Sequence, residues 1–499
     1  METITKRKLI IMMNYFDQRR AGILLHLSSL PGQEACGTLG QEAYNFIDFL
    51  ANIGCSVWQM LPIGPTVLHS SPYQLSSIHA GNPIFIDLKW LQQRGWLPLK
   101  PPISAISAIH KHDFIAQSRL EFIKHANSQD HNLYEQFINK QAYWLDDYVL
   151  FQALHLEFDT PWWEWSQPIR NREPQALVAA NTKYVNLIAT LKYEQFIFAL
   201  QWLNLKKYAN QKGILLFGDM PIFVAQDSAE VWAQPKIFDL DAKGLPKVVA
   251  GVPPDYFSAT GQRWGNPLYN WERMQEDNFT FWMQRMRTQL DLFDIIRIDH
   301  FRGLESYWAI PATEVNAVKG NWLPAPGDAL FTELQNVFGT LPLVAEDLGI
   351  ITPAVNALRQ RYALPGMKVL QFAFYGDATN PYLPFNHTVD SVVYTGTHDN
   401  DTSLGWYQQL DTHTKNYVDE FLGVPQESMP WPLIRTALGS VARLAIIPMQ
   451  DILALDSQHR MNTPGTVGGN WSWRFQWDWI PDGLAYRIKR MVSYYGRHL

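Results

Sequence analysis

The chain has 499 residues, of which 47% are hydrophobic and 18% are charged, and its formal net charge is −6. It contains no basic run, and no apolar run of the roughly 18 residues that a membrane helix needs, so neither nucleic acid nor a membrane is expected as a partner. The apolar run within residues 1–16 is too short for a secretory signal. The two cysteines, Cys36 and Cys55, are too few for a disulfide framework, and we expect a cytoplasmic protein.

Eight short apolar runs, each ending in a polar or small residue, predict buried β-strands. Helical patterns lie between several of them, which is typical of parallel βα units. Eight such units predict an α/β fold of the (β/α)8 TIM-barrel class. In chain order the runs lie near Leu24, Val57, Leu215, Ile296, Val344, Leu370, Val393 and Ile446.

Two of the intervening helices have clear boundary signals. Residues 42–53 form an amphipathic pattern that Gly54 ends. Its apolar face consists of Ala43, Phe46, Ile47 and Leu50. Farther along, Thr352 is a predicted N-cap and Pro353 occupies the first helical position.

The spacing of the predicted strands is uneven, which indicates insertions. We expect an N-terminal extension over residues 1–19 and a single barrel domain over residues 20–499. Long insertions are expected at about 64–212 and 221–290. Insertions of this length in a compact barrel commonly act as lids or functional subdomains.

The chain is rich in tryptophan, with 20 residues that include clusters at 162–165 and 471–479. An indole ring offers a flat apolar face and one donor, which suits the C–H face and the hydroxyls of a sugar. The alternative for any single tryptophan is that it fills the core.

Charged residues follow four of the predicted strands. Because the carboxyl ends of barrel strands form the rim of the active site, these side chains are expected to meet there. Grouped carboxylates repel one another and resist desolvation, so such a cluster indicates a function. Taken singly, each residue has a plainer role, such as helix capping. The residues are Asp219, Arg297 with Asp299, Glu346, and His398 with Asp399.

Arg297 and Asp299 lie two residues apart and therefore point to the same face of their strand. The cation should lower the pKa of Asp299 and keep it ionised, as a nucleophile requires. Glu346 has no neighbouring cation in the sequence, so a closed cleft should raise its pKa, which suits a general acid. Such a pair fits retaining glycoside chemistry, in which the carboxyls lie about 5–5.5 Å apart. The alternative is an Arg–Asp pair that only ties the rim together.

Several longer motifs resemble those of the amylomaltases, the 4-α-glucanotransferases of glycoside hydrolase family 77. They extend from about Arg20 to the C-terminus and include "GILLHLSSLPG", "SPYQ", "FGDMPIFVAQDSAEVWAQP", "GVPPDYFSATGQRWGNPLYNW", "IIRIDHFRG", "VAEDLG", "GTHDN" and "RMNTPGT". The resemblance implies a (β/α)8 barrel with inserted subdomains and without a C-terminal β-sandwich. It also implies that no metal or organic cofactor takes part.

The resemblance further implies roles for individual residues. Asp299 would be the nucleophile, Glu346 the acid/base, and Asp399 the carboxylate that binds the 2- and 3-hydroxyls of the reacting sugar. Residues that would bind substrate around them are Arg297, Asp219, His398, Tyr73, Tyr256, Phe257 and Asn462. Tyr73 would be the platform under the sugar ring, and Tyr256 and Phe257 would belong to a loop that covers the bound chain.

The implied reaction moves α-1,4-glucan segments between maltodextrin or starch-type chains, with glucose as one acceptor. An α-glucan hydrolase with the same residues and a looser lid remains an alternative. A non-catalytic glycan-binding protein is a second alternative, but it would keep the aromatic residues without needing three carboxylates together.

Overall fold

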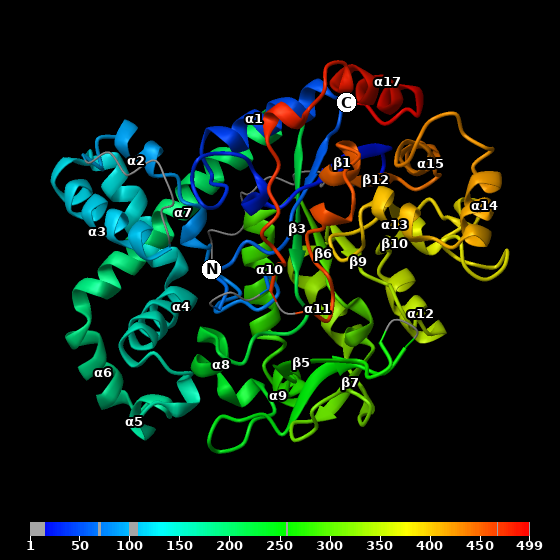
Figure 1. Ribbon diagram of the computed structural model, residues 1–499. Coiled ribbons are helices and arrows are strands. Elements are labelled where there is room, and N and C mark those ends of the chain that lie inside the picture. The colour runs from blue at the N-terminus through cyan, green and yellow to red at the C-terminus, as the bar shows by residue number, and fades with distance from the viewer. Residues whose placement is uncertain (1–14, 68–70, 99–107, 256–257, 467, 499) are drawn as a thin grey trace.

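The computed structural model describes residues 15–67, 71–98, 108–255, 258–466 and 468–498, and its centre is an eight-stranded parallel sheet (Figure 1). In spatial order the strands are β10 (Gly366–Val369), β11 (Ser391–Tyr394), β12 (Leu444–Pro448), β1 (Arg20–Leu24), β2 (Val57–Gln59), β3 (Leu215–Met220), β6 (Ile295–Ile298) and β9 (Leu343–Ala345). The outermost two meet, because Ala345 N–H donates to the Pro365 carbonyl at 2.8 Å and Met367 N–H donates to Asp347 Oδ1 at 2.6 Å. The sheet thus closes into the predicted (β/α)8 barrel.

Alternation along the strands decides which side chains enter the barrel. On β6, Ile295 lies in the apolar cluster inside the barrel, whereas Ile296 and Ile298 pack with the surrounding elements. Arg297 is therefore on the inner face, directly above Ile295, and it is buried. The inner cluster draws on every strand of the barrel and includes Leu24, Val57, Phe217, Ile295, Val344, Met367, Val392 and Leu444.

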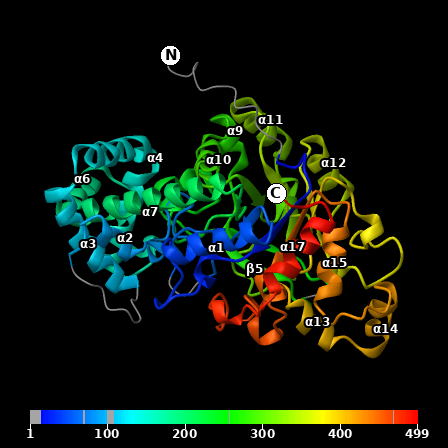
Figure 2. The same ribbon diagram turned by 90° about the horizontal axis from the view of Figure 1, so that it is seen from above.

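The outer helices follow the sequence pattern. In α1 (Gln41–Asn52) the buried residues are the four that were predicted, Ala43, Phe46, Ile47 and Leu50. Gly54, just beyond this helix, has a φ of 77°. The side chain of Thr352 accepts from Val355 N–H at 3.3 Å and caps α12 (Pro353–Arg361), as predicted. Further helices around the barrel are α10 (Thr280–Leu292), α11 (Gly327–Phe338), α13 (Ser403–Gln409), α14 (Thr412–Phe421), α15 (Trp431–Gly439) and α17 (Leu484–Tyr494) (Figure 2).

A helical region between β2 and β3 lies to one side of the barrel in both ribbon views (Figures 1 and 2). It contains α2 (Leu88–Gln93), α3 (Ala108–His125), α4 (Ser128–Phe158), α5 (Gln167–Arg170), α6 (Pro174–Lys183) and α7 (Val185–Gln211). Two buried glutamines of α7 fasten the chain that follows β2. Gln195 exchanges hydrogen bonds with the backbone of Gly81 at 2.8 and 2.9 Å, and Gln201 does so with Asp87 at 2.8 and 3.0 Å.

A second, antiparallel sheet has the order β5-β4-β7-β8. Its strands are β4 (Val248–Val252), β5 (Gln262–Pro267), β7 (Ser306–Pro311) and β8 (Asn321–Pro324). Two of them precede β6 in the chain and two follow it, so this sheet is joined to the barrel at both ends of one barrel strand. The sequence predicts an insertion before β6 but not the pair of strands after it.

Beyond β12, the described residues 449–466 and 468–498 contain α16 (Met449–Ile452) and α17 but no strand. Among the described residues, no helix combines the length and apolar character needed to cross a membrane.

Candidate active site

Arg297 joins two barrel strands at the centre of the site. It is the register partner of Asp219 on β3, and its Nη1 lies 2.6 Å from Asp219 Oδ2. Its Nη2 lies 2.9 Å from Oδ1 of Asp299, just beyond the end of β6. The side chains of Arg297 and Asp219 are only 6% and 1% exposed, whereas 28% of Asp299 is accessible. The predicted Arg297–Asp299 pair is confirmed, and it shares its cation with a deeper carboxylate.

The predicted pKa of Asp299 is wrong in direction. Burial raises this pKa, and the negative charges of Asp219 and Asp399 raise it further, while Arg297 lowers it. The net result is a pKa above the ordinary value for aspartate. The sequence displays the adjacent cation but neither the desolvation nor the two other carboxylates that the fold brings in.

Glu346 stands directly after β9 and is buried. Its Oε2 accepts from His300 N–H at 2.7 Å and its Oε1 accepts from Leu348 N–H at 3.2 Å. Burial raises its pKa above the usual range, the charge of Asp299 adds to this, and Arg297 opposes it. The predicted rise is confirmed.

The backbone of His300 has a left-handed conformation, with a φ of 49°. Such a conformation is uncommon outside glycine. Here it accompanies the hydrogen bond from its N–H to Glu346. The His300 ring meets the partly exposed Trp264 of β5 edge-on, with ring centroids 4.8 Å apart, so the second sheet touches the site beside Glu346.

Tyr73 and His398 form a stacked pair at the site, with ring centroids 5.4 Å apart and an interplanar angle of 21°. The Tyr73 hydroxyl donates to Asp219 Oδ2 at 2.8 Å and lies 2.9 Å from His398 Nε2. Because its proton goes to Asp219, its oxygen accepts from the histidine when Nε2 carries hydrogen. Trp471 lies against both rings, and its ring centroid is 6.2 Å from that of Tyr73 and 6.0 Å from that of His398.

Asp399 follows His398 in the loop after β11, and its side chain is 48% exposed. Its Oδ1 accepts from Asn462 Nδ2 at 2.6 Å and lies 3.3 Å from His398 Nε2. Burial disfavours its ionised form, but the charge and hydrogen bond of His398 and the hydrogen bond of Asn462 outweigh burial. The pKa of Asp399 is therefore held below the usual range for aspartate.

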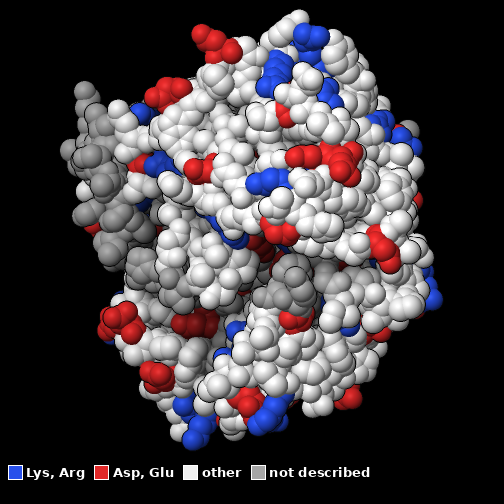
Figure 3. Space-filling view, turned by 45° about the vertical axis from the view of Figure 1, so that its right-hand side comes forward, with Lys and Arg blue, Asp and Glu red and all other residues white. Residues whose placement is uncertain are grey.

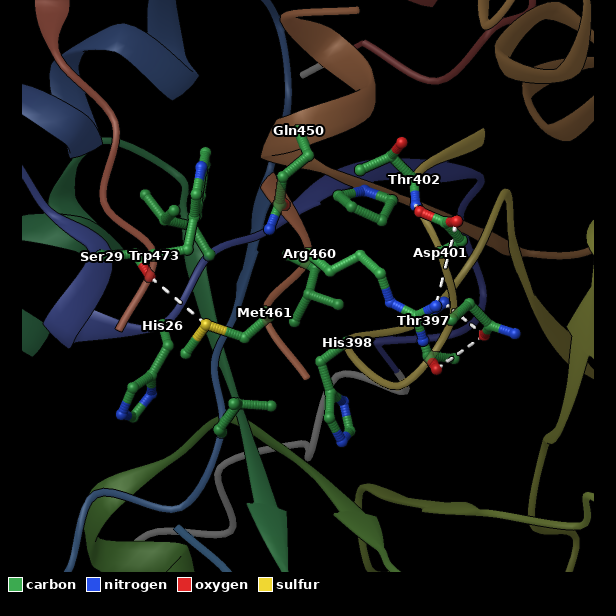
Figure 4. A pocket seen from close by; sticks show the side chains of 15 residues that line it. His26, Ser29, Thr397, His398, Asp401, Thr402, Gln450, Arg460, Met461 and Trp473 are labelled. Atoms are coloured by element: carbon green, nitrogen blue, oxygen red, sulfur yellow. Dashed lines mark hydrogen bonds and ion pairs between the residues drawn. The ribbon is translucent and has the colours of Figure 1, made fainter. Parts of the chain in front are cut away.

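Figure 3 shows acidic side chains deep within a hollow of the molecular surface. A separate cavity of about 30 Å³ lies behind His398 and is lined by His26, Gln450, Arg460 and Trp473, among others (Figure 4). Neither Asp299 nor Glu346 lines it.

The fold brings together all but two of the site residues that the sequence suggested. Tyr256 and Phe257 lie outside the described residues. Two tryptophans of the 162–165 cluster, Trp162 and Trp165, are only 2% and 3% exposed and belong to the core. His300 and Arg460 reach the site without having been singled out, although each lies in a motif that was quoted above. Trp471, from the tryptophan cluster at 471–479, also reaches the site.

Comparison with known proteins agrees with this geometry. The family model described as 4-alpha-glucanotransferase matches residues 25–479. A relative of that name from Thermus thermophilus is 48% identical over 472 residues, which cover 91% of this chain and 94% of the relative. The chain belongs to the 4-α-glucanotransferase family. A family member from Synechocystis sp. is 46% identical over 499 residues, covering 97% of this chain and 99% of its own.

Solved structures give the same result. The amylomaltase from Streptococcus agalactiae in complex with acarbose matches with a TM-score of 0.92 and 35% identity, over 97% of this chain and 100% of that one. The amylomaltase from Corynebacterium glutamicum, with a TM-score of 0.75 and 17% identity, covers 97% of this chain and 76% of its own and shows the shared fold. The predicted resemblance and the predicted fold are both confirmed.

Proposed function

We propose that this family member transfers segments of α-1,4-glucan between maltodextrin chains by a retaining double displacement. Asp299 is the nucleophile, Glu346 the acid/base, and Asp399 the carboxylate that binds the reacting sugar. The observation that supports this most is geometric. The buried guanidinium of Arg297 pairs with Asp219 and Asp299, and Glu346 and Asp399 follow other strands of the same barrel. Burial raises the pKa values of Asp299 and Glu346, whereas the donors around Asp399 lower its pKa.

In the first step Asp299 attacks the anomeric carbon while Glu346 protonates the departing 4-oxygen. Arg297 holds Oδ1 of Asp299, which leaves Oδ2 to form the covalent bond. The raised pKa of Glu346 keeps a proton on it near neutrality, and the cation keeps enough Asp299 ionised to react.

In the second step Glu346, now a carboxylate, takes the proton from the 4-hydroxyl of an acceptor glucan. The acceptor attacks the glycosyl–enzyme and restores an α-1,4 bond. Its ring must lie close to Glu346, and the partly exposed Trp264, which contacts His300 beside Glu346, offers an aromatic face there. Glucose is the smallest acceptor that we propose.

Asp399 holds the sugar rather than transferring protons. Its low pKa keeps it a strong acceptor for the 2- and 3-hydroxyls of the reacting ring. The hydrogen bonds that lower this pKa also fix its direction. Tyr73 stacks on the adjacent His398 and forms the wall beneath the same ring.

Incubation of the enzyme with maltotriose tests the reaction class. Transfer gives glucose and a ladder of longer maltodextrins, with little gain in total reducing ends. Reducing ends that rise in step with glucose release would favour the hydrolase alternative instead. The Asp299→Asn variant, purified in the same way, serves as the blank for contaminating activity.

We also propose a cytoplasmic location, because Cys36 and Cys55 are both free thiols. Fractionation of the source cells would test it, and recovery of the enzyme in an organelle or outside the cell would contradict it.

A further inference from the structure

Arg460 contacts the sugar-binding part of the site from behind. Its Nη2 donates to the carbonyl oxygen of Asp399 at 3.0 Å, and its Nε donates to the carbonyl oxygen of Asn462 at 3.1 Å. Its Nη1 lies 3.9 Å from Oδ2 of Asp401. A single planar guanidinium therefore reaches three groups with three different nitrogens.

Two of these groups belong to residues that bind each other. Asn462 Nδ2 donates to Asp399 Oδ1 at 2.6 Å, although the two residues are 63 positions apart in the chain. They lie on separate segments, one after β11 and one after β12. Because Arg460 holds the backbone carbonyls of both, it fixes the distance between the segments that this short contact requires.

The third group, the carboxylate of Asp401, is itself held in place by hydrogen bonds. Asp401 accepts from Ser457 Oγ at 2.7 Å, from Gln409 Nε2 at 2.8 Å and from the N–H of Thr402 at 2.7 Å. Figure 4 shows the Arg460 side chain extending toward Asp401 and Thr397, in the cavity behind His398. The Arg460 guanidinium therefore lies near a carboxylate whose orientation is fixed by other hydrogen bonds.

We propose that Arg460 is a positioning residue, which sets the Asn462–Asp399 contact and thereby the direction of the carboxylate that holds the reacting sugar. This inference rests on the proposed function, since it assumes that Asp399 binds substrate. Arg460 acts through Asp399 and Asn462, because its hydrogen bonds go to their carbonyl oxygens and leave the Asp399 carboxylate free for the sugar.

Arg460→Lys separates this role from that of a simple charge. Lysine keeps the cation but is a point donor that cannot hold two carbonyls in a fixed relation. We expect kcat for maltotriose to fall on the order of 10- to 100-fold with a smaller change in KM, because a small misplacement of a binding group costs mainly the reacting geometry. Thermal unfolding should stay close to that of the wild type.

A matched control is Arg435→Lys. Arg435 pairs with Glu427 at 2.7 Å on the outer helix α15, away from the carboxylates, and its replacement should leave kcat unchanged. A wild-type kcat in Arg460→Lys, or a loss of equal size in both variants, would overturn the proposal.

A double-mutant cycle with Asn462→Ala tests the route of action. If Arg460 acts through Asn462, the double variant loses no more activity than the more damaging single variant. Losses that multiply would mean independent roles and would overturn the proposal. Should Arg460→Lys fold poorly, Arg460→Gln takes its place in the same cycle.

Chemical rescue gives a further readout. Arg460→Ala should recover activity in millimolar guanidinium but not in equal sodium chloride, and no recovery would count against the role. The wild-type product pattern judges the proposed function separately. A wild-type enzyme that hydrolyses rather than transfers would refute that function and leave the Arg460 cycle interpretable.

Discussion

The two halves of the candidate site shift the pKa values of their carboxyl groups in opposite directions. Around the ends of β6 and β9, crowding and burial raise the pKa values of Asp299 and Glu346. Around the ends of β11 and β12, donors from His398 and Asn462 lower the pKa of Asp399. The pKa of a carboxyl is therefore raised or lowered according to the burial, charges and donors that the fold places around it.

This difference follows from how each half is built. The first half has one guanidinium for two aspartates, so part of the negative charge there is uncompensated. In the second half, hydrogen-bond donors come from two segments that lie far apart in the chain. Single substitutions can disrupt one half alone or measure how strongly it shifts the pKa of its carboxyl.

The largest effect is expected from Asp299→Asn, which removes the proposed nucleophile. An amide cannot form the covalent intermediate, so transfer from maltotriose should fall by roughly 10⁴-fold or more. Product sizing after long incubation measures it. Retention of more than a few per cent of wild-type transfer, in a preparation free of wild-type enzyme, would mean that another group forms the bond.

Glu346→Gln should be the next most damaging change and should depend on the donor. With maltotriose we expect a loss of about 10²- to 10⁴-fold, because no proton reaches the leaving oxygen. With α-glucosyl fluoride the first step should survive, since fluoride leaves without a proton. Fluoride release and maltotriose turnover are measured side by side. Equal losses with both donors, in a folded protein, would exclude Glu346 as the acid.

Arg297 tests how the first half sets the charge of Asp299. The cation favours the ionised carboxylate, so its removal raises the pKa of Asp299 and moves the acidic limb of the rate profile to higher pH, by about one unit or more. Arg297→Lys keeps a charge and should shift the limb less than Arg297→Ala. An unmoved limb in both variants would leave the pair with a purely structural role.

The alanine variant should also be less stable. Removal of Arg297 leaves Asp219 buried without its cation, and loss of one partner of a buried pair typically costs about 3–5 kcal/mol. Urea unfolding of both Arg297 variants separates this cost from the pH effect. The lysine variant should keep most of the stability.

The smallest effect is expected at Trp471, which packs against the second half of the site. Its φ of 65° is unusual for a large side chain, and its ring lies against Tyr73 and His398. Trp471→Phe should weaken the aromatic contact and lower kcat about 2- to 10-fold. Trp479→Phe is the matched control, because Trp479 lies in the same tryptophan cluster but contacts His459 instead. Equal effects of the two substitutions would argue against a role for Trp471 at the site.

The barrel and the first half of the site could be predicted because their signals are local. Each barrel strand is a short apolar run, and the pairing of Arg297 with Asp299 follows from strand alternation alone. Strand β8 gave no such signal, because all four of its residues are exposed and it therefore lacks an apolar run.

The rest depends on tertiary structure. The pKa of Asp299 rises through desolvation and through carboxylates from other strands, which no local pattern contains. Arg460 donates to the backbone carbonyl of Asp399, 61 positions away in the chain. Because every residue has such a carbonyl, the sequence could not show which residue Arg460 contacts. The left-handed backbone of His300 could not be predicted either, because a histidine does not indicate a positive φ as a glycine does.

The most direct test of the account is to identify the residue that carries the glycosyl group. Glu346→Gln incubated with α-glucosyl fluoride should accumulate a covalent intermediate, because the variant can form it but lacks the base that activates an acceptor. Mass spectrometry should then find one added glucosyl unit, and peptide mapping should assign it to Asp299. An adduct on any other residue, or fluoride release without any adduct in a rapidly quenched reaction, would contradict the central claim.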